Sequence, residues 1–132
     1  MHALNGLTTL INAAMPFIPN TAEFVREQCA SCLEFVAPNQ FLTDLAAGGY
    51  TVPGVTYTSI ISKYDTVVTP YTNGRIDEAG VSNIVLQDKC GFDSSGHLAM
   101  AADPNVNLLI RRALDPENPP AMHCSIALPA PF

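Results

Sequence analysis

Asp65 and His97 are the two residues of this 132-residue sequence whose types and positions best suit proton-transfer chemistry. Asp65 follows a predicted strand in the segment ISKYDTVVTPY, and His97 follows the next predicted strand in CGFDSSGHLAM. Functional side chains of α/β enzymes gather just beyond the carboxyl ends of such strands. An imidazole at that position can act as a general base, and a carboxylate beside it can orient the ring.

The order of these residues along the chain, acid and then histidine, is that of the last two members of an α/β-hydrolase Ser-Asp-His triad. In such a triad the imidazole takes the proton of the nucleophile and returns it to the leaving group. The carboxylate fixes the tautomer and stabilises the imidazolium. From position alone, a surface or capping role is the competing interpretation of both residues.

Other polar residues near His97 have simpler interpretations. Ser94 and Ser95 are expected to hydrogen-bond local backbone rather than to replace a missing nucleophile. Four residues could be drawn together as a metal site: Asp93, His97, Asp103 and His123. No two of them have the spacing of ligands on one helix, and Asp103 has the position of a helix cap. We therefore expect no metal site and no cofactor, and an exposed role for His123.

The four cysteines favour disulfides over metal or redox chemistry. Cys29 and Cys32 form a single CxxC, whereas a zinc ribbon needs a second one, and Cys90 and Cys124 stand alone. The CxxC lies near the end of a helical pattern, whereas a thioredoxin-type CxxC opens a helix after a strand. Four cysteines allow three disulfide connectivities. Disulfides indicate an exported protein, yet no secretory signal precedes them, which suggests a piece of a longer protein.

The elements expected to position these residues are helices first and strands later. Helices are predicted over residues 3–14, from Thr21 as N-cap to about Cys32, and from Pro38 and Asn39 to Gly48. Strands are predicted over Val55–Ser62, as a buried strand, and over Val81–Gln87, with a loop over 63–80 between them. A last helix follows, with Asp103 as its cap and Pro104 as its first residue, before an extended proline-rich tail. Its predicted buried stripe consists of Val106, Leu109, Ile110 and Ala113.

Length and composition allow one domain with a core and exclude several partners. Hydrophobic residues make up 48% and charged residues 14%, so the chain is too apolar for disorder. Twelve acidic against six basic residues give a net charge of −6. The cations are Arg26, Lys63, Arg75, Lys89, Arg111 and Arg112. They form no basic patch for nucleic acid, and no apolar run reaches the ~20 residues of a membrane span.

Two longer segments carry a family resemblance. FLTDLAAGGYTVPGVTYTSIISKYDTVVTPY and NIVLQDKCGFDSSGHLAMAADP resemble the C-terminal part of secreted bacterial triacylglycerol lipases of the actinomycete type, and more distantly yeast lipase B. The resemblance runs from about Leu4 to Cys124. It implies the α/β class with a partial α/β-hydrolase fold: cap helices within 1–50, then the last two parallel strands and a C-terminal helix within 51–132.

The resemblance also implies roles for individual residues. The aspartate of YDxVVTP and the histidine of GHLxM complete the triad, which implies that Asp65 and His97 are catalytic. Val67 would line the acyl pocket. The cap-region residues Leu10 and Ile11 would belong to the acyl-binding wall, although such an apolar stripe is ordinary core in most proteins. The family pairing of cysteines implies the bonds Cys90–Cys124 and Cys29–Cys32, which is the connectivity that we favour.

One family feature is missing from these residues. No GxSxG nucleophile motif occurs, because Ser82 and Ser94 each have only one glycine of that pattern. The sequence is therefore expected to be the C-terminal portion of a lipase, either an ester hydrolase acting on a small ester or lipid or a non-catalytic interaction module. Two parallel strands also lack enough partners to form a stable sheet, which predicts a homodimer or larger assembly.

Overall fold

The chain forms a short parallel sheet with helices before and after it. The computed structural model describes residues 17, 21–28 and 40–126. Its α-helices and strands in chain order are α2 Thr21–Gln28, α4 Gln40–Ala46, β1 Tyr57–Ile61, β2 Val81–Val85, α5 Leu86–Lys89 and α6 Pro104–Leu114. Two short 3₁₀ helices are η1 Tyr71–Gly74 and η2 Ala99–Ala102. The predicted helix over residues 3–14, and the end of the helix predicted to reach Cys32, lie outside the described residues.

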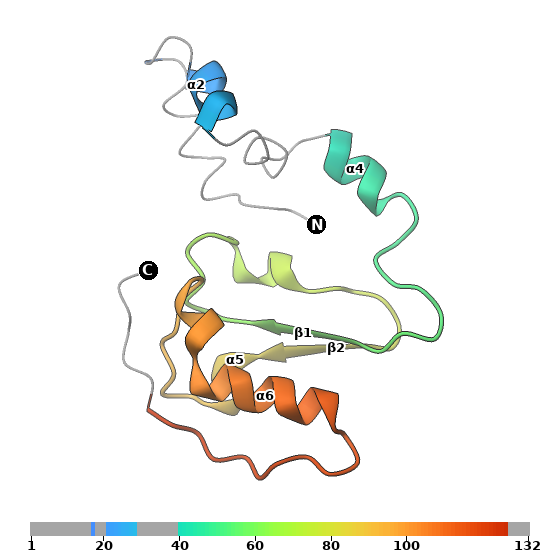
Figure 1. Ribbon diagram of the computed structural model, residues 1–132, viewed down its shortest axis with the longest axis vertical. Helices are drawn as coiled ribbons and strands as arrows, with labels where there is room; N and C mark the ends of the chain where they lie inside the picture. The colour runs from blue at the N-terminus through green and yellow to red at the C-terminus, as the bar shows by residue number, and fades with distance from the viewer. Residues whose placement is uncertain (1–16, 18–20, 29–39, 127–132) are drawn as a thin grey trace.

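β1 and β2 pair in parallel, in the register Tyr57 with Val81 through Ile61 with Val85. In Figure 1 both arrows point the same way, so the two strands end at the same edge. The α/β class and the parallel pairing predicted from the sequence are thus confirmed in the described part of the chain. The crossover between the strands contains η1, where an uninterrupted loop was predicted.

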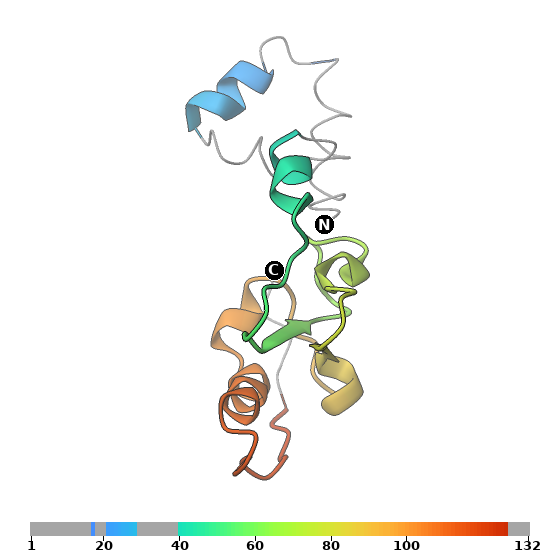
Figure 2. The ribbon, with the colours of Figure 1, turned by 90° about the vertical axis from the view of Figure 1, so that its right-hand side faces the viewer.

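Different elements lie on the two faces of this sheet. Figure 2 shows α6 on one side of the strands and η1 on the other. On the η1 side, Ser59 Oγ donates a hydrogen bond to the carbonyl of Gly74 at 2.7 Å. A Cβ at Gly74 would lie 2.7 Å from Ile61 Cγ2, so only glycine allows η1 to approach the strand this closely. This contact connects the crossover directly to β1.

A small apolar core lies on the α6 side. Leu86, Val106 and Leu109 are buried, and Ile60 and Ile84 pack against them from the strands. The predicted stripe on α6 is wrong at Ile110, which is 43% exposed. The described sheet of two strands covers a narrow strip of the helix, whose buried residues are Asn105, Val106 and Leu109. For the same reason β1 is only half-buried, where a buried strand was predicted.

The strand predicted over Val81–Gln87 is also shorter than expected. β2 ends at Val85, and the chain turns into α5 at Leu86. The turn places the Leu86 side chain in the core, where it is fully buried. Gln87 then faces the end of β1, because its Oε1 accepts a hydrogen bond from the Lys63 amide at 2.8 Å. β1 in turn begins at Tyr57 rather than Val55, since pairing with β2 starts there.

Helix α6 has the predicted start. Asp103 caps it by accepting hydrogen bonds from the amides of Asn105 and Val106, and Pro104 is its first residue. A carboxylate at this position satisfies amides that have no partner within the helix, and it interacts favourably with the helix dipole. The tail after α6 contains no helix or strand as far as residue 126 and bends at residues 116–118. None of the described helices has both the length and the apolar character needed to cross a membrane.

Glu78 connects the crossover to the segment that leads into β1. Its carboxylate accepts hydrogen bonds from the Tyr50 amide at 2.6 Å and from the Thr51 hydroxyl. Gly49, with φ of +83°, lies so close that a Cβ there would be 3.3 Å from Glu78 Oε1. The hydrogen bond from Thr51 and that from the Tyr50 amide together lower the pKa of Glu78 below its ordinary value of 4.5. The ionised carboxylate of Glu78 is therefore the form that binds the segment at Tyr50 and Thr51.

The lowered pKa of Glu78 predicts a pH-dependent contribution to stability. The folded state binds fewer protons at Glu78 than the unfolded state, so the contribution is complete above pH 4.5 and is lost as pH falls through the lowered pKa. Urea unfolding of the wild type and Glu78→Gln should show a less stable variant at neutral pH and a shrinking difference in acid. A difference that stays constant or grows on acidification would contradict this assignment.

Candidate catalytic pair at the carboxyl end of the sheet

Asp65 lies in the loop that follows β1, and backbone amides hold its carboxylate. Its Oδ1 accepts hydrogen bonds from the amides of Val67 and Val68, both at 2.8 Å. Its own amide donates to the Ser62 carbonyl at the end of the strand, at 3.2 Å. The Asp65 side chain is only 12% exposed. Local backbone geometry alone therefore directs the second oxygen, Oδ2, away from the loop.

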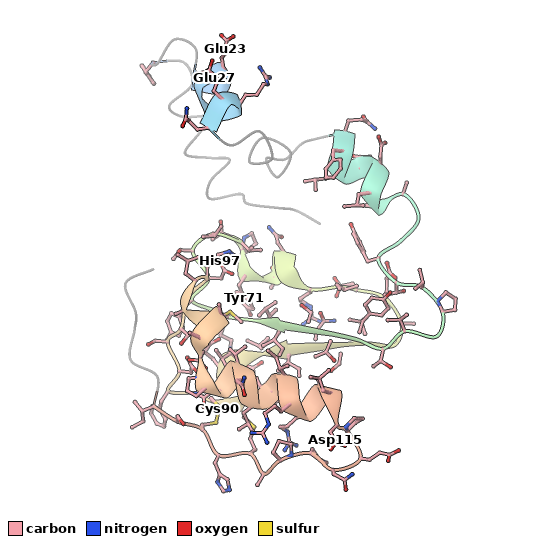
Figure 3. The ribbon with its side chains drawn as sticks, in the orientation of Figure 1. Glu23, Glu27, Tyr71, Cys90, His97 and Asp115 are labelled. Atoms are coloured by element: carbon pink, nitrogen blue, oxygen red, sulfur yellow. A yellow bond between two sulfur atoms is a disulfide. The ribbon has the colours of Figure 1, made fainter. Side chains whose placement is uncertain are left out.

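His97 meets that second oxygen from the loop that follows α5. Its Nδ1 lies 2.9 Å from Asp65 Oδ2, although the two residues are 32 positions apart in the sequence. Figure 3 shows His97 at the end of the sheet toward which both strands point. The imidazole is 37% exposed. Among the described residues, Asp65 is the hydrogen-bond partner that the structure gives to His97.

This geometry determines which imidazole nitrogen can act as a base. An ionised carboxylate only accepts hydrogen bonds, so beside an ionised Asp65 this contact favours the tautomer in which Nδ1–H of His97 donates a hydrogen bond to Oδ2. In the neutral ring, Nε2 then has a free lone pair. An exposed ring with this tautomer can take a proton from a hydroxyl or a water molecule, while the carboxylate stabilises the resulting imidazolium.

The loop that carries His97 is held by buried polar contacts. Asp93 is fully buried, and its carboxylate accepts from the Ser95 amide at 2.9 Å and from Asn105 Nδ2 at 2.7 Å. Ser95 Oγ donates to the cap residue Asp103 at 2.6 Å. Sequence reasoning assigned Ser95 to bonds with local backbone, but its hydroxyl instead bonds with a carboxylate. At 2% exposure it is also inaccessible as a nucleophile.

The same loop is attached to the C-terminal tail. A disulfide joins Cys90 to Cys124, which is one of the two bonds in the favoured connectivity. Next to it, Asn105 donates to the Ser125 carbonyl at 2.8 Å and accepts from the Ser125 amide at 2.7 Å. The start of the His97 loop is thus fixed covalently and its middle through hydrogen bonds. Figure 3 labels Cys90 and His97 on this loop.

The remaining predicted site residues have different outcomes. Val67 contributes its backbone amide to Asp65, and its side chain is half-buried. Leu10 and Ile11, predicted for the acyl-binding wall, lie outside the described residues. So do Cys29 and Cys32. The exposed position predicted for His123 is confirmed.

Two cavities lie away from the pair. One of about 600 Å³ is lined by side chains of both strands, α6 and the tail, including Thr58, Ile84 and Met122. The other, of about 510 Å³, lies beside α6 and includes Asp103, Arg111 and His123. Asp65 and His97 line neither of them. In the part of the chain that the structure describes, no three His, Cys, Asp or Glu side chains form a group suited to a metal ion.

No protein-family model matches the chain, and no curated protein matches it. The interpretation of the site therefore depends on its geometry.

The Cys90–Cys124 bond predicts a measurable loss of stability on its removal. A bond between residues 34 positions apart restricts the unfolded chain, which the chain-entropy model values at roughly 3 to 4 kcal/mol. Urea unfolding of the double variant Cys90→Ala/Cys124→Ala should show a loss of about that size. The matched control is Cys29→Ala/Cys32→Ala, whose cysteines are close in sequence and should contribute less. Equal unfolding midpoints for the wild type and the Cys90/Cys124 variant would refute this expectation.

Proposed function

We propose that this chain is the acid and base half of a carboxylic-ester hydrolase of the lipase type, built on a partial α/β-hydrolase fold. The observation that carries the proposal is the 2.9 Å contact between His97 Nδ1 and Asp65 Oδ2. The two residues come from the loops that follow adjacent parallel strands, where α/β enzymes place catalytic groups. The motifs YDTVVTP and GHLAM around the same residues support it independently.

Each atom of the pair has a defined role in this proposal. Nε2 of His97 takes the proton of the attacking hydroxyl as its oxygen bonds to the ester carbonyl carbon. The imidazolium then gives that proton to the departing alkoxide. Asp65 accepts hydrogen bonds from the amides of Val67 and Val68 and from the imidazole, and it orients the ring and stabilises the imidazolium. Water repeats the cycle on the acyl intermediate and releases the acid.

The nucleophile in this proposal comes from residues outside these 132, because no GxSxG motif occurs among them. The substrate is a small ester or a lipid. Val67, Leu10 and Ile11 are proposed to contact its acyl chain, in line with the family resemblance. The environment is an oxidising one outside the cell, consistent with the Cys90–Cys124 disulfide.

A second candidate function is non-catalytic. The observation in its favour is that no described side chain hydrogen-bonds to Nε2 of His97, and that Ser95 is committed to Asp103. On this alternative the chain is a lipase-derived interaction module stabilised by its disulfide. Replacing His97 would then change neither the binding nor the stability of the chain.

Self-association is also part of the proposal. The described sheet has two strands, β1 is only half-buried, and several large apolar side chains are exposed. Those nearest the pair in sequence are Tyr64 at 53%, Phe92 at 92% and Leu98 at 67%. Apolar surface and strand edges of this kind favour association with a second copy.

The hydrolase proposal predicts that activity depends on His97. Without its nucleophile partner, the pair should still activate water toward p-nitrophenyl butyrate, slowly but with turnover. His97→Ala should reduce that rate by about 10²-fold, at the lower end of general base catalysis. Asp65→Asn should reduce it by at least roughly tenfold, because the wrong tautomer then predominates. Initial rates at equal protein concentration measure both effects.

The chain provides its own control for that experiment. His123 is an exposed histidine in the tail and takes no part in the hydrogen bond of the pair, so His123→Ala should keep the wild-type rate. Equal rates for the wild type, His97→Ala and His123→Ala would reject the hydrolase and favour the interaction module.

Self-association predicts a defined assembly in solution. Sedimentation velocity at micromolar concentration should give a species with at least twice the mass of the 14.1 kDa chain. Phe92 is the most exposed of the three apolar side chains near the pair. Phe92→Ser therefore tests whether this surface lies in the contact between the copies. A single sharp monomer at that concentration would contradict the proposal.

A further inference from the structure

Gln87 connects the two loops that carry Asp65 and His97. Its Oε1 accepts from the Lys63 amide at 2.8 Å, just beyond the end of β1. Its Nε2 donates both to Ser62 Oγ at 2.9 Å and to the Asp93 carbonyl at 3.2 Å. A single carboxamide thus contacts the strand end that precedes Asp65 and the loop that leads to His97.

Ser62 extends the same connection. This residue is fully buried, and its hydroxyl donates to the Ser95 carbonyl at 2.6 Å. The same oxygen accepts from the Tyr64 amide at 3.1 Å and from Gln87. Every hydrogen-bonding position of the hydroxyl is therefore used. We call Gln87 and Ser62 the interloop clamp.

The interloop clamp acts close to the pair on both sides. On one side it holds the amides of Lys63 and Tyr64, and Tyr64 directly precedes Asp65. On the other it holds the carbonyl of Ser95, two residues before His97. By contrast, the covalent path between Asp65 and His97 is 32 residues long. The clamp is thus a short connection between the two loops, with Ser62 buried and Gln87 half-buried.

We propose that Gln87 is a positioning residue that sets the contact between Asp65 and His97. In catalytic terms this role depends on the proposed function of the pair, but the geometric effect can be measured without any activity. A glutamine fits because its amide supplies two donors and one acceptor to three fixed partners. A glutamate would lose both donors and present a negative charge to the Asp93 carbonyl. A methionine would fill the same space but form none of the three hydrogen bonds.

The test reads the tautomer of His97 directly. Long-range proton–nitrogen NMR spectra of the whole ¹⁵N-labelled chain are recorded at alkaline pH, where the imidazole is neutral. The signals of His97 are those that disappear in His97→Ala. In the wild type, Nδ1 should have the shift of a protonated nitrogen and Nε2 that of an unprotonated one. Asp65→Asn should remove this preference and provides the reference for a broken pair.

Gln87→Met should have the same effect as Asp65→Asn, with loss of the Nδ1–H form in favour of the Nε2–H form that free imidazole prefers. The matched control is Gln40→Met, which removes a glutamine amide bonded to Asp44 in α4 and should leave the His97 spectrum unchanged. Amide signals of Asn105 and Val106 at the start of α6 report whether each variant keeps its fold. A folded Gln87→Met with a wild-type His97 spectrum overturns the inference.

If Gln87→Met does not fold, Ser62→Ala tests the interloop clamp instead. This variant removes the hydroxyl that donates to the Ser95 carbonyl and leaves Gln87 in place. Loss of the Nδ1–H form in that variant supports the interloop clamp, and its retention overturns it. The proposed function fails separately, through equal hydrolysis rates for the wild type and His97→Ala. If the wild-type spectrum lacks the Nδ1–H form, the hydrogen bond between His97 and Asp65 does not form in solution, and both proposals fail.

Discussion

The parallel pairing of β1 with β2 places the loops that carry Asp65 and His97 at the same edge of the sheet. Because the strands run in the same direction, the loops after Ile61 and Val85 leave from one edge of the sheet. Asp65 follows the first of these strands directly, and His97 follows the second after the short helix α5. Antiparallel strands would have placed the two loops at opposite ends. The 2.9 Å contact between the side chains thus depends on strand direction.

Buried polar residues are nearly as numerous in the described fold as buried apolar ones. Six apolar and five polar or charged residues are buried, so the core alone cannot determine the geometry of the loops. Most of the buried polar residues lie in or beside the His97 loop. Asp93, Ser95, Asp103 and Asn105 hydrogen-bond there to one another or to backbone. Satisfied networks of this kind define one arrangement, because any displacement leaves a buried polar group without its partner.

The arrangement resembles that of a catalytic site because its parts are held independently. Backbone amides orient Asp65, the disulfide and Asn105 attach the His97 loop to the tail, and the interloop clamp joins the two loops. Of the two side chains in the pair, the imidazole is the more open to solvent, at 37% exposure against 12% for the carboxylate. A rigid acid beside an accessible base is what proton transfer to an external substrate needs.

The sequence by itself determined the α/β class, the two strands, the Asp103 cap and the candidates Asp65 and His97, because these depend on local patterns and short motifs. It misplaced the end of β2, where the chain turns into α5 and buries Leu86, and the exposure of Ile110, because both depend on tertiary packing. Only the tertiary structure decided the partners of Gln87, Ser62 and Ser95. Each of these bonds joins residues that are not neighbours in the sequence, and a single glutamine or serine carries no local signal of such a partner.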